Sequence, residues 1–371
     1  MKHINRYAIL AVAGSLLFLV GCHARKEAHL PAWEAANPIR PLPAMPLGIT
    51  KKLTDLPNPP TPQRIRLGRW LFYDKRLSAD GRISCEGCHH SENAFADTFA
   101  VSIGIHGQKL LVGQPEGRPM VPRKAPSLIN EAWTLFPNFF WDGRSNSIDS
   151  LDILPISNPM AMGSTSEAMI QTLKNNGYAP YFKEGFGTEE ITKERVGKAI
   201  ADYQRTRISG NSPWDKWKDT RDDSLVSAHV KLGDELFFGK AGCSQCHFDQ
   251  SFTDSSFHNI GIGWDSRTRT FNDQGHFGVT KVETDRGAFK TPTLRDVSLH
   301  PPYMHDGSLA TLRDVVDHYN KGGARNPHLD PKIRQLHLTN DEINALVEFL
   351  EGLKGEGYQD SPPASFPQRS M

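Results

Sequence analysis

Two copies of a five-residue motif, C-x-x-C-H, constrain this chain more than any other feature of its sequence. They are Cys85-Glu86-Gly87-Cys88-His89 and Cys243-Ser244-Gln245-Cys246-His247. In this motif the two thiols add to the vinyl groups of one haem, and the adjacent histidine reaches the iron. A C-x-x-C pair alone is also compatible with half a zinc site or with a redox pair. Because a histidine follows both copies, we interpret them as attachment sites for two covalently bound c-type haems.

The fifth cysteine, Cys22, lies at the end of an N-terminal segment typical of exported proteins. A positively charged start is followed by an apolar stretch over residues 8–20, and Leu19-Val20-Gly21-Cys22 resembles the lipobox of bacterial lipoproteins. We therefore expect a lipoprotein signal segment, lipid attachment at Cys22 and a position on the periplasmic side of a bacterial membrane. An ordinary signal peptide is the alternative. The apolar stretch is short for a transmembrane helix.

The composition favours a globular protein with little sheet. The chain has 371 residues and a formal net charge of +1, so it lacks the basic footprint of a nucleic-acid-binding protein and we expect no such partner. Glycine and proline are frequent and alternating apolar patterns are scarce, which favours short helices and long loops. We predict a mainly α fold with two cytochrome c-like haem domains.

A weak internal repeat supports two haem domains. Residues 67–72 and 232–238 each predict a helix that leads into a loop and then a haem motif. Near the C terminus, a helix beginning at residues 340–342 has apolar residues at helical spacing up to Leu353, and we treat it as core. The expected order is signal segment, proline-rich tether, N-terminal haem domain, C-terminal haem domain and tail, over residues 1–22, 23–62, 63–220, 221–358 and 359–371.

Further short stretches, in their order and spacing, resemble the bacterial di-haem cytochrome c peroxidase and MauG superfamily. The resemblance covers residues 67–353 and implies that peroxide reacts at the N-terminal haem. It also implies that His89 and His247 are iron ligands and that Trp141 relays electrons between the haems. The stretches are Ser102-Ile103-Gly104, Arg123-Lys124-Ala125-Pro126-Ser127, Phe140-Trp141-Asp142-Gly143-Arg144, Asn158-Pro159, Phe257-His258-Asn259-Ile260-Gly261, and Phe289-Lys290-Thr291-Pro292-Thr293-Leu294-Arg295 through Pro302-Tyr303-Met304-His305-Asp306-Gly307.

The branch of the superfamily depends on the residue fourteen positions after His305, which is Tyr319. Relatives that are peroxidases carry methionine there, whereas MauG-like enzymes carry tyrosine as the sixth iron ligand. A phenolate favours higher oxidation states of iron, and a thioether favours Fe(II). The resemblance therefore implies a MauG-like, specifically MbnH-like, branch. In the alternative, Tyr319 is a packing residue after a helix over residues 309–318, and Met304 or His318 is the ligand.

The peroxide-reactive side departs from the family pattern. Relatives place an acid twenty positions after the tryptophan, where it moves protons, but this chain has Ala161 there, and Leu151 replaces the usual glutamine. Pro155 matches the pattern. His106 is a candidate distal residue for proton transfer or iron ligation, with a loop histidine as the alternative.

A second departure concerns the calcium ion that relatives bind between the haems. Lys124 stands where relatives have a calcium-binding asparagine, so calcium is uncertain, and we expect the ammonium group to replace the ion unless it points to solvent. By their charge, Arg123, Arg295 and His305 are candidates for binding haem propionates, and structural salt bridges are the alternative. Trp214 and Trp217 are either exit points for electron holes or packing anchors.

Three functions follow from these residues. The favoured one is an enzyme that uses hydrogen peroxide to form a high-valent di-haem state and then oxidises a residue of a partner protein, with tryptophan as a specific candidate. The second is a cytochrome c peroxidase that reduces peroxide with electrons from a small redox protein. The third is a di-haem electron carrier without turnover chemistry.

Overall fold

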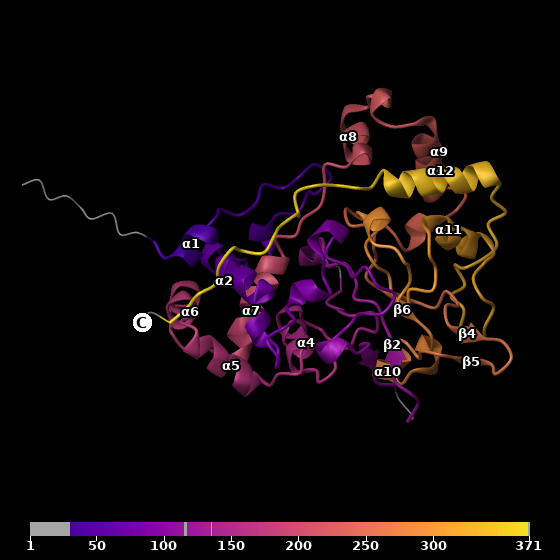
Figure 1. The fold of residues 1–371 in the computed structure, drawn as a ribbon. Helices are drawn as coiled ribbons and strands as arrows, with labels where there is room; N and C mark the ends of the chain where they lie inside the picture. Colours follow the sequence, from indigo (N-terminus) through magenta and orange to yellow (C-terminus); the bar gives the residue numbers. More distant parts are fainter. Residues whose placement is uncertain (1–29, 115–116, 135, 370–371) are drawn as a thin grey trace, which may run out of the picture. The chain divides into compact units, whose positions relative to one another are not determined.

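The computed structural model describes residues 30–114, 117–134 and 136–369. Short helices joined by long loops make up most of this part of the chain, which confirms the prediction of a mainly α protein (Figure 1). Cys22, the predicted signal segment and the beginning of the predicted tether lie outside the described residues. Among the described residues, no helix is both long enough and apolar enough to span a bilayer.

Each strand spans only two residues, and the strands pair antiparallel as β1-β2, β3-β6 and β4-β5. The strands are β1 (Leu111–Val112), β2 (Val121–Pro122), β3 (Phe257–His258), β4 (Trp264–Asp265), β5 (Thr270–Phe271) and β6 (Phe289–Lys290). The α-helices are α1 (Ala32–Ala36), α2 (Pro62–Tyr73), α3 (Ile148–Leu151), α4 (Ile153–Ser157), α5 (Ser166–Asn175), α6 (Ala179–Phe186), α7 (Lys193–Gln204), α8 (Pro213–Thr220), α9 (Ala228–Phe238), α10 (Phe277–Thr280), α11 (Leu312–Asn320) and α12 (Asn340–Glu351).

The predicted helix before the first haem motif is α2, which packs against α7. The Thr61 side chain accepts a hydrogen bond from the Arg64 amide and so caps the start of α2. The two helices approach closely at Gly68, where an added Cβ would lie 1.8 Å from the carbonyl oxygen of Ala199. Only glycine fits this crossing, so the sequence of α2 fixes the distance between the two helices.

The predicted helix before the second motif is α9, and it repeats this arrangement with α12. An added Cβ at Gly233 would lie 2.2 Å from the carbonyl oxygen of Ala345. A capping box between Thr339 and Glu342 begins α12, and its predicted apolar face is buried as expected. The prediction that α12 belongs to the core is therefore confirmed.

The buried apolar residues form two large clusters, one built mainly from residues 67–203 and the other from residues 236–353. The segment after α12 returns to the first cluster, which includes Tyr358. Asp360 then forms a salt bridge with Arg69 of α2, at 2.7 Å. The C-terminal segment thus packs beside α2, which lies near the beginning of the described chain. Figure 1 shows this segment in yellow.

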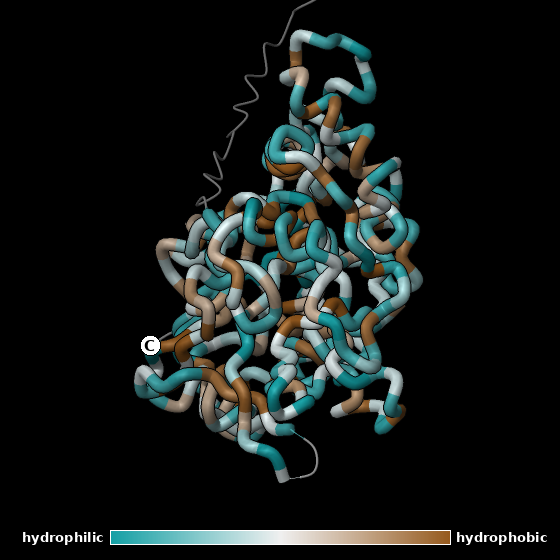
Figure 2. Tube along the Cα trace, turned by 90° about the vertical axis from the view of Figure 1, so that its right-hand side faces the viewer, coloured by the Kyte–Doolittle hydropathy of each residue, from teal (hydrophilic) through white to brown (hydrophobic). Residues whose placement is uncertain are grey.

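The connection between α8 and α9, over residues 221–227, joins two helices that both pack against the second cluster, α8 through Trp214 and α9 through Leu236 and Phe237. It is the mostly hydrophilic loop at the top of Figure 2. Further along, α11 begins at Leu312, three residues later than predicted. The reason is a capping box in which the Thr311 side chain accepts from the Asp314 amide and Asp314 accepts from the Thr311 amide.

Candidate haem sites

The first motif presents His89 in the form that an iron ligand requires. Cys85 and Cys88 lie on a single turn, and the His89 amide donates to the Cys85 carbonyl. The His89 Nδ1–H donates to the Phe95 carbonyl at 2.8 Å. This bond fixes the tautomer and leaves the Nε2 lone pair free for a metal. Burial lowers the pKa of His89, so the ring is neutral.

The second motif has the same geometry. The His247 amide donates to the Cys243 carbonyl, and His247 Nδ1–H donates to the Phe252 carbonyl at 2.9 Å. Burial lowers the pKa of His247 as well. The two motifs therefore each present one neutral imidazole with a free Nε2, which fits two haem irons.

The cysteines fit haem attachment better than the zinc or redox alternatives. All four motif cysteines are free of disulfides. Burial raises the pKa of Cys88 and of Cys243 to about 12, whereas a redox-active C-x-x-C pair needs a lowered pKa. Within the described residues, the one group of three with metal-binding spacing is Cys246, Asp254 and His258, which leaves out Cys243, the other cysteine of the motif.

A cavity of about 260 Å³ is lined by residues of the second motif and by Trp141. It brings together Cys243, Cys246, His247, His305 and Tyr319 from the sequence prediction. Burial raises the pKa of Tyr319, and the described residues offer its hydroxyl no hydrogen-bond partner. Tyr319 is only partly buried, so its hydroxyl is open to the cavity and available to an iron ion there.

Met304 and His318, the alternatives to Tyr319 as iron ligand, differ in their surroundings. His318 Nε2–H donates to the Ile260 carbonyl at 2.9 Å, so this nitrogen is not available to iron. Met304 lines the same cavity as Tyr319. His318 is not among the residues that line this cavity, so the structure disfavours it and leaves Met304 as the alternative.

Trp141 also lines this cavity and is held through Lys124. The Trp141 indole N–H donates to the Lys124 carbonyl at 2.8 Å, and the Lys124 amide donates to the His305 carbonyl at 2.8 Å. The His305 ring lies 6.5 Å from the Trp141 ring and stacks on Phe289 at 3.5 Å. Burial lowers the pKa of His305 to about 4, so its imidazole is neutral beside the indole.

The Lys124 side chain points inward, not to solvent. It is 4 % exposed, and its ammonium donates to the carbonyls of His300 at 2.7 Å and Pro302 at 2.8 Å. Burial lowers the pKa of Lys124 to about 8, which still leaves it largely charged at neutral pH. The ammonium therefore binds two backbone carbonyls, as a metal cation could, and its replacement of calcium stays a prediction.

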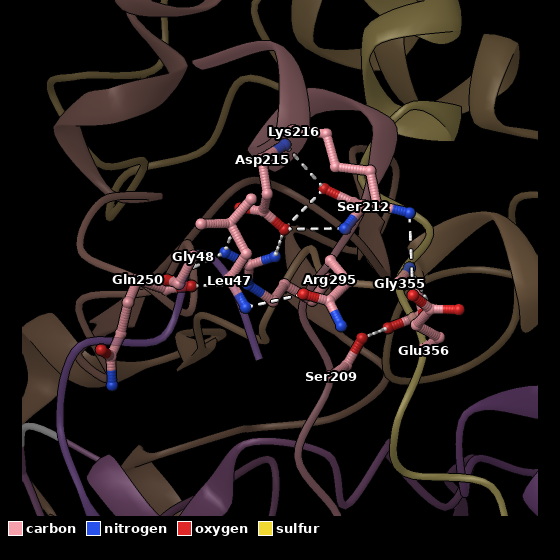
Figure 3. A network of polar contacts seen from close by, with 12 residues as sticks. Leu47, Gly48, Ser209, Ser212, Asp215, Lys216, Gln250, Arg295, Gly355 and Glu356 are labelled. Carbon is pink, nitrogen blue, oxygen red and sulfur yellow. Dashed lines mark hydrogen bonds and ion pairs between the residues drawn. The ribbon is translucent and has the colours of Figure 1, made fainter. Parts of the chain in front are cut away.

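Both candidate arginines are held by carboxylates. Arg123 donates to Asp273 through two nitrogens, at 2.6 and 2.8 Å, and to Asp142 at 2.6 Å. Arg295 donates to both oxygens of Asp215, at 2.7 and 2.9 Å (Figure 3). These contacts agree with the structural alternative, and a role toward haem propionates stays a prediction.

The structure brings together fewer of the residues that the resemblance places on a peroxide-reactive side. Pro155 lies in α4, and the carbonyl of the buried Ala161 accepts from the Ile105 amide at 2.7 Å. The neighbouring His106 is 70 % exposed, and its Nδ1 lies 3.7 Å from a carboxylate oxygen of Asp80. His106 is not among the residues that line the cavity with Trp141, so its distal role stays a prediction.

Glu131 and Lys290 are among the charged residues of the cavity that sequence reasoning missed. Burial raises the pKa of Glu131 to about 7 and lowers the pKa of Lys290. One Glu131 carboxylate oxygen is buried without a partner among the described residues. Lys290 stands in a stretch that carries the family resemblance, whereas Glu131 belongs to no motif.

Comparison with known proteins gives the family. The family model for di-haem cytochrome c peroxidases matches residues 62–223. The methylamine utilization protein MauG of Methylorubrum extorquens is 40% identical over 303 residues, which cover 81% of this chain and 80% of that protein. The chain belongs to the di-haem cytochrome c peroxidase and MauG superfamily. It is therefore a hydrogen peroxide-dependent oxidoreductase, and the superfamily implies two c-type haems.

Other members of this superfamily are also similar over most of their length. The cytochrome c551 peroxidase of Nitrosomonas europaea is 33% identical over 326 residues, covering 87% of this chain and 86% of that protein. A crystal structure of a MauG-like protein associated with microbial copper homeostasis superimposes with a TM-score of 0.74 at 28% identity, covering 92% of this chain and 99% of that one. The diheme peroxidase BthA of Burkholderia thailandensis has the same fold, with a TM-score of 0.68 at 21% identity, covering 87% of this chain and 94% of that one.

Proposed function

We propose that this protein is a MauG-like periplasmic enzyme that uses hydrogen peroxide to oxidise a residue of a partner protein, with tryptophan as the first candidate residue. The observation that carries the proposal is Tyr319, which shares one cavity with the motif of Cys243, Cys246 and His247. A phenolate on iron favours high oxidation states and makes a stored reducing electron unfavourable. The similarity to MauG at 40% identity supports the same branch.

Within this proposal each residue has a distinct task. When bound, the two haems supply the capacity to accept electrons after peroxide has been reduced. His89 and His247 offer Nε2 to the irons, since their Nδ1–H groups are held by backbone carbonyls. The indole of Trp141 is held against the cavity by the Lys124 carbonyl. We assign residues 63–220 and 221–358 to two cytochrome c-like domains, with Trp141 between their haems.

Proton delivery is the part in which this chain departs most from its relatives. Reduction of one peroxide to two waters consumes two protons and two electrons. Ala161 has no proton to give, and the exposed His106 lies beside Asp80. Glu131, whose pKa burial raises to about 7, lines the cavity. A carboxyl with such a pKa exchanges protons readily near neutral pH, so we assign proton storage to Glu131.

The test compares the ferric protein with Tyr319→Phe and with Tyr303→Phe, a control that removes another hydroxyl from the same cavity. We expect one high-spin and one low-spin haem in the EPR spectrum of the wild type. Peroxide without a donor should convert both to a long-lived EPR-silent state. Tyr319→Phe should change the low-spin signal and shorten the life of this state, whereas Tyr303→Phe should behave as the wild type.

Two results would contradict the proposal. Two low-spin haems that ignore peroxide would identify an electron carrier. Rapid peroxide turnover with ferrocytochrome c, unchanged in Tyr319→Phe, would identify a cytochrome c peroxidase.

A further inference from the structure

An aromatic cluster connects the second haem motif with the protein surface. The carbonyl that accepts from His247 Nδ1–H belongs to Phe252. The Phe252 ring packs edge-on against Trp214 of α8, with 5.1 Å between ring centroids. Trp214 in turn stacks against Phe238, which ends α9 and is 47 % exposed. Phe252 therefore lies between His247, the predicted iron ligand, and the partly exposed indole of Trp214.

The surroundings of Trp214 favour the loss of an electron together with a proton. Its indole N–H donates to Asp234 Oδ1 at 2.7 Å, so a proton acceptor is already in place. The Lys218 ammonium donates to Asp234 Oδ2 at 3.0 Å and lies 5.5 Å from the Trp214 ring centroid. This positive charge disfavours a cationic indole, and transfer of the proton to Asp234 would leave a neutral one.

We propose that Trp214 is the port through which electrons enter the C-terminal haem site from a one-electron donor outside the protein. This inference rests on the proposed function, because peroxide is the oxidant that draws the electrons. In each one-electron transfer, which we call a passage, the Trp214 indole gives one electron to the haem site and its N–H proton to Asp234. The external donor then returns one electron to the indole, and the proton moves back. Two passages supply the two electrons that one peroxide consumes.

Other tryptophans are less suited to this role. Trp141 is tied to the Lys124 carbonyl inside the cavity. Trp217 donates to Asp223 near the surface, but its ring is not in contact with Phe252. Trp264 lies on β4 against Phe271, at 4.9 Å. Trp264 is therefore a matched control for loss of an indole elsewhere in the molecule.

The experiment uses the haem-loaded protein with Trp214→Phe, Asp234→Asn and Trp264→Phe. Stopped-flow spectroscopy would follow first the reaction with peroxide and then reduction of the oxidised protein by ferrocytochrome c. We expect Trp214→Phe to react with peroxide as the wild type does and to be reduced about tenfold more slowly, a change equal to about 1.4 kcal/mol in a barrier. Asp234→Asn should also slow reduction, and Trp264→Phe should change neither step.

A second readout does not depend on turnover. With excess peroxide and no donor, mass spectrometry of tryptic peptides should find oxygen added to Trp214 in the wild type and much less in Asp234→Asn. Two results would refute the role of Trp214 as an electron port. One is an equal rate of reduction in the wild type and Trp214→Phe, and the other is equal addition of oxygen to Trp214 and Trp264.

Failure of the proposed function would be recognised separately, as a wild type that does not react with peroxide. The port is then tested by reduction of the ferric protein with flavodoxin hydroquinone. Trp214→Phe should again be about tenfold slower than the wild type, and equal rates would overturn the inference.

Discussion

Replacement of Arg295 by methionine should destabilise the protein strongly and leave haem attachment intact. Arg295 and Asp215 are both buried, with side chains 1% and 0% exposed. Besides the two bonds to Asp215, the guanidinium donates to the carbonyls of Gln250 and Gly48. Methionine has a similar length and no donor, so the substitution leaves a buried carboxylate and two carbonyls without these partners.

The expected loss follows from the burial of the pair. Removing one partner of a buried ion pair costs about 3–5 kcal/mol in the free energy of unfolding, because the remaining charge is left uncompensated. Asp215 still accepts from the amide and hydroxyl of Ser212, which favours the lower half of this range. Replacing both partners, in Arg295→Met with Asp215→Asn, should therefore destabilise less than the sum of the two single substitutions.

The assay is urea denaturation of the haem-loaded protein at pH 7, followed by far-ultraviolet circular dichroism and by haem absorbance. Arg267→Met is the control, because Arg267 is 90% exposed and its ion pair with Asp265 spans 3.5 Å; an exposed pair contributes about 0–1 kcal/mol. A loss below about 1 kcal/mol for Arg295→Met would refute the reasoning from burial. A native-state haem spectrum changed without loss of stability would instead indicate contact with a propionate.

Three further predictions concern the cavity and its surroundings. Lys124→Asn should make the stability depend on calcium, whereas that of the wild type should be unaffected by calcium or chelator in the same urea titration. Burial raises the folded-state pKa of Glu131 to about 7, so its contribution to stability is complete below the ordinary pKa of 4.5 and is lost as the pH rises through 7. The wild type should therefore lose stability relative to Glu131→Gln over this pH range. Parallel pH profiles of the two proteins would contradict the raised pKa. Ala161→Glu should speed the stopped-flow reaction with peroxide by at least about tenfold through general acid catalysis, and Ala161→Gln, which offers no carboxylic proton, should not.

The sequence predicted local secondary structure better than it predicted contacts between distant segments of the chain. The helices α2, α9 and α12 follow from apolar spacing and capping residues, which act within a few positions. The return of Asp360 to Arg69 depends on packing between distant segments, which no local pattern encodes. The three-residue error at the start of α11 arose because the capping box at Thr311 was overlooked.

The candidate sites show the same division. Fixed spacing made it possible to predict the two haem motifs and to place Tyr319 near the second of them, whereas ligation by Tyr319 stays a prediction. The sequence indicated that Arg295 is important but not that Asp215 is its partner, since eighty positions separate them. The sequence showed that Lys124 departs from the family pattern, but it did not show that the ammonium donates to the carbonyls of His300 and Pro302. Glu131 carries no motif at all, and its significance comes only from the cavity that surrounds it.

The paired glycine crossings bear on the history of the chain. Gly68 faces Ala199 and Gly233 faces Ala345 in the same way, and each lies in a helix directly before a haem motif. A contact that admits only hydrogen tolerates almost no substitution, because any side chain would push the helices apart. If the halves descend from one duplicated ancestor, these crossings are where the ancestral sequence would erode most slowly. The weak repeat at residues 67–72 and 232–238 would then have been preserved by the contact between helices and not by the chemistry of the haem.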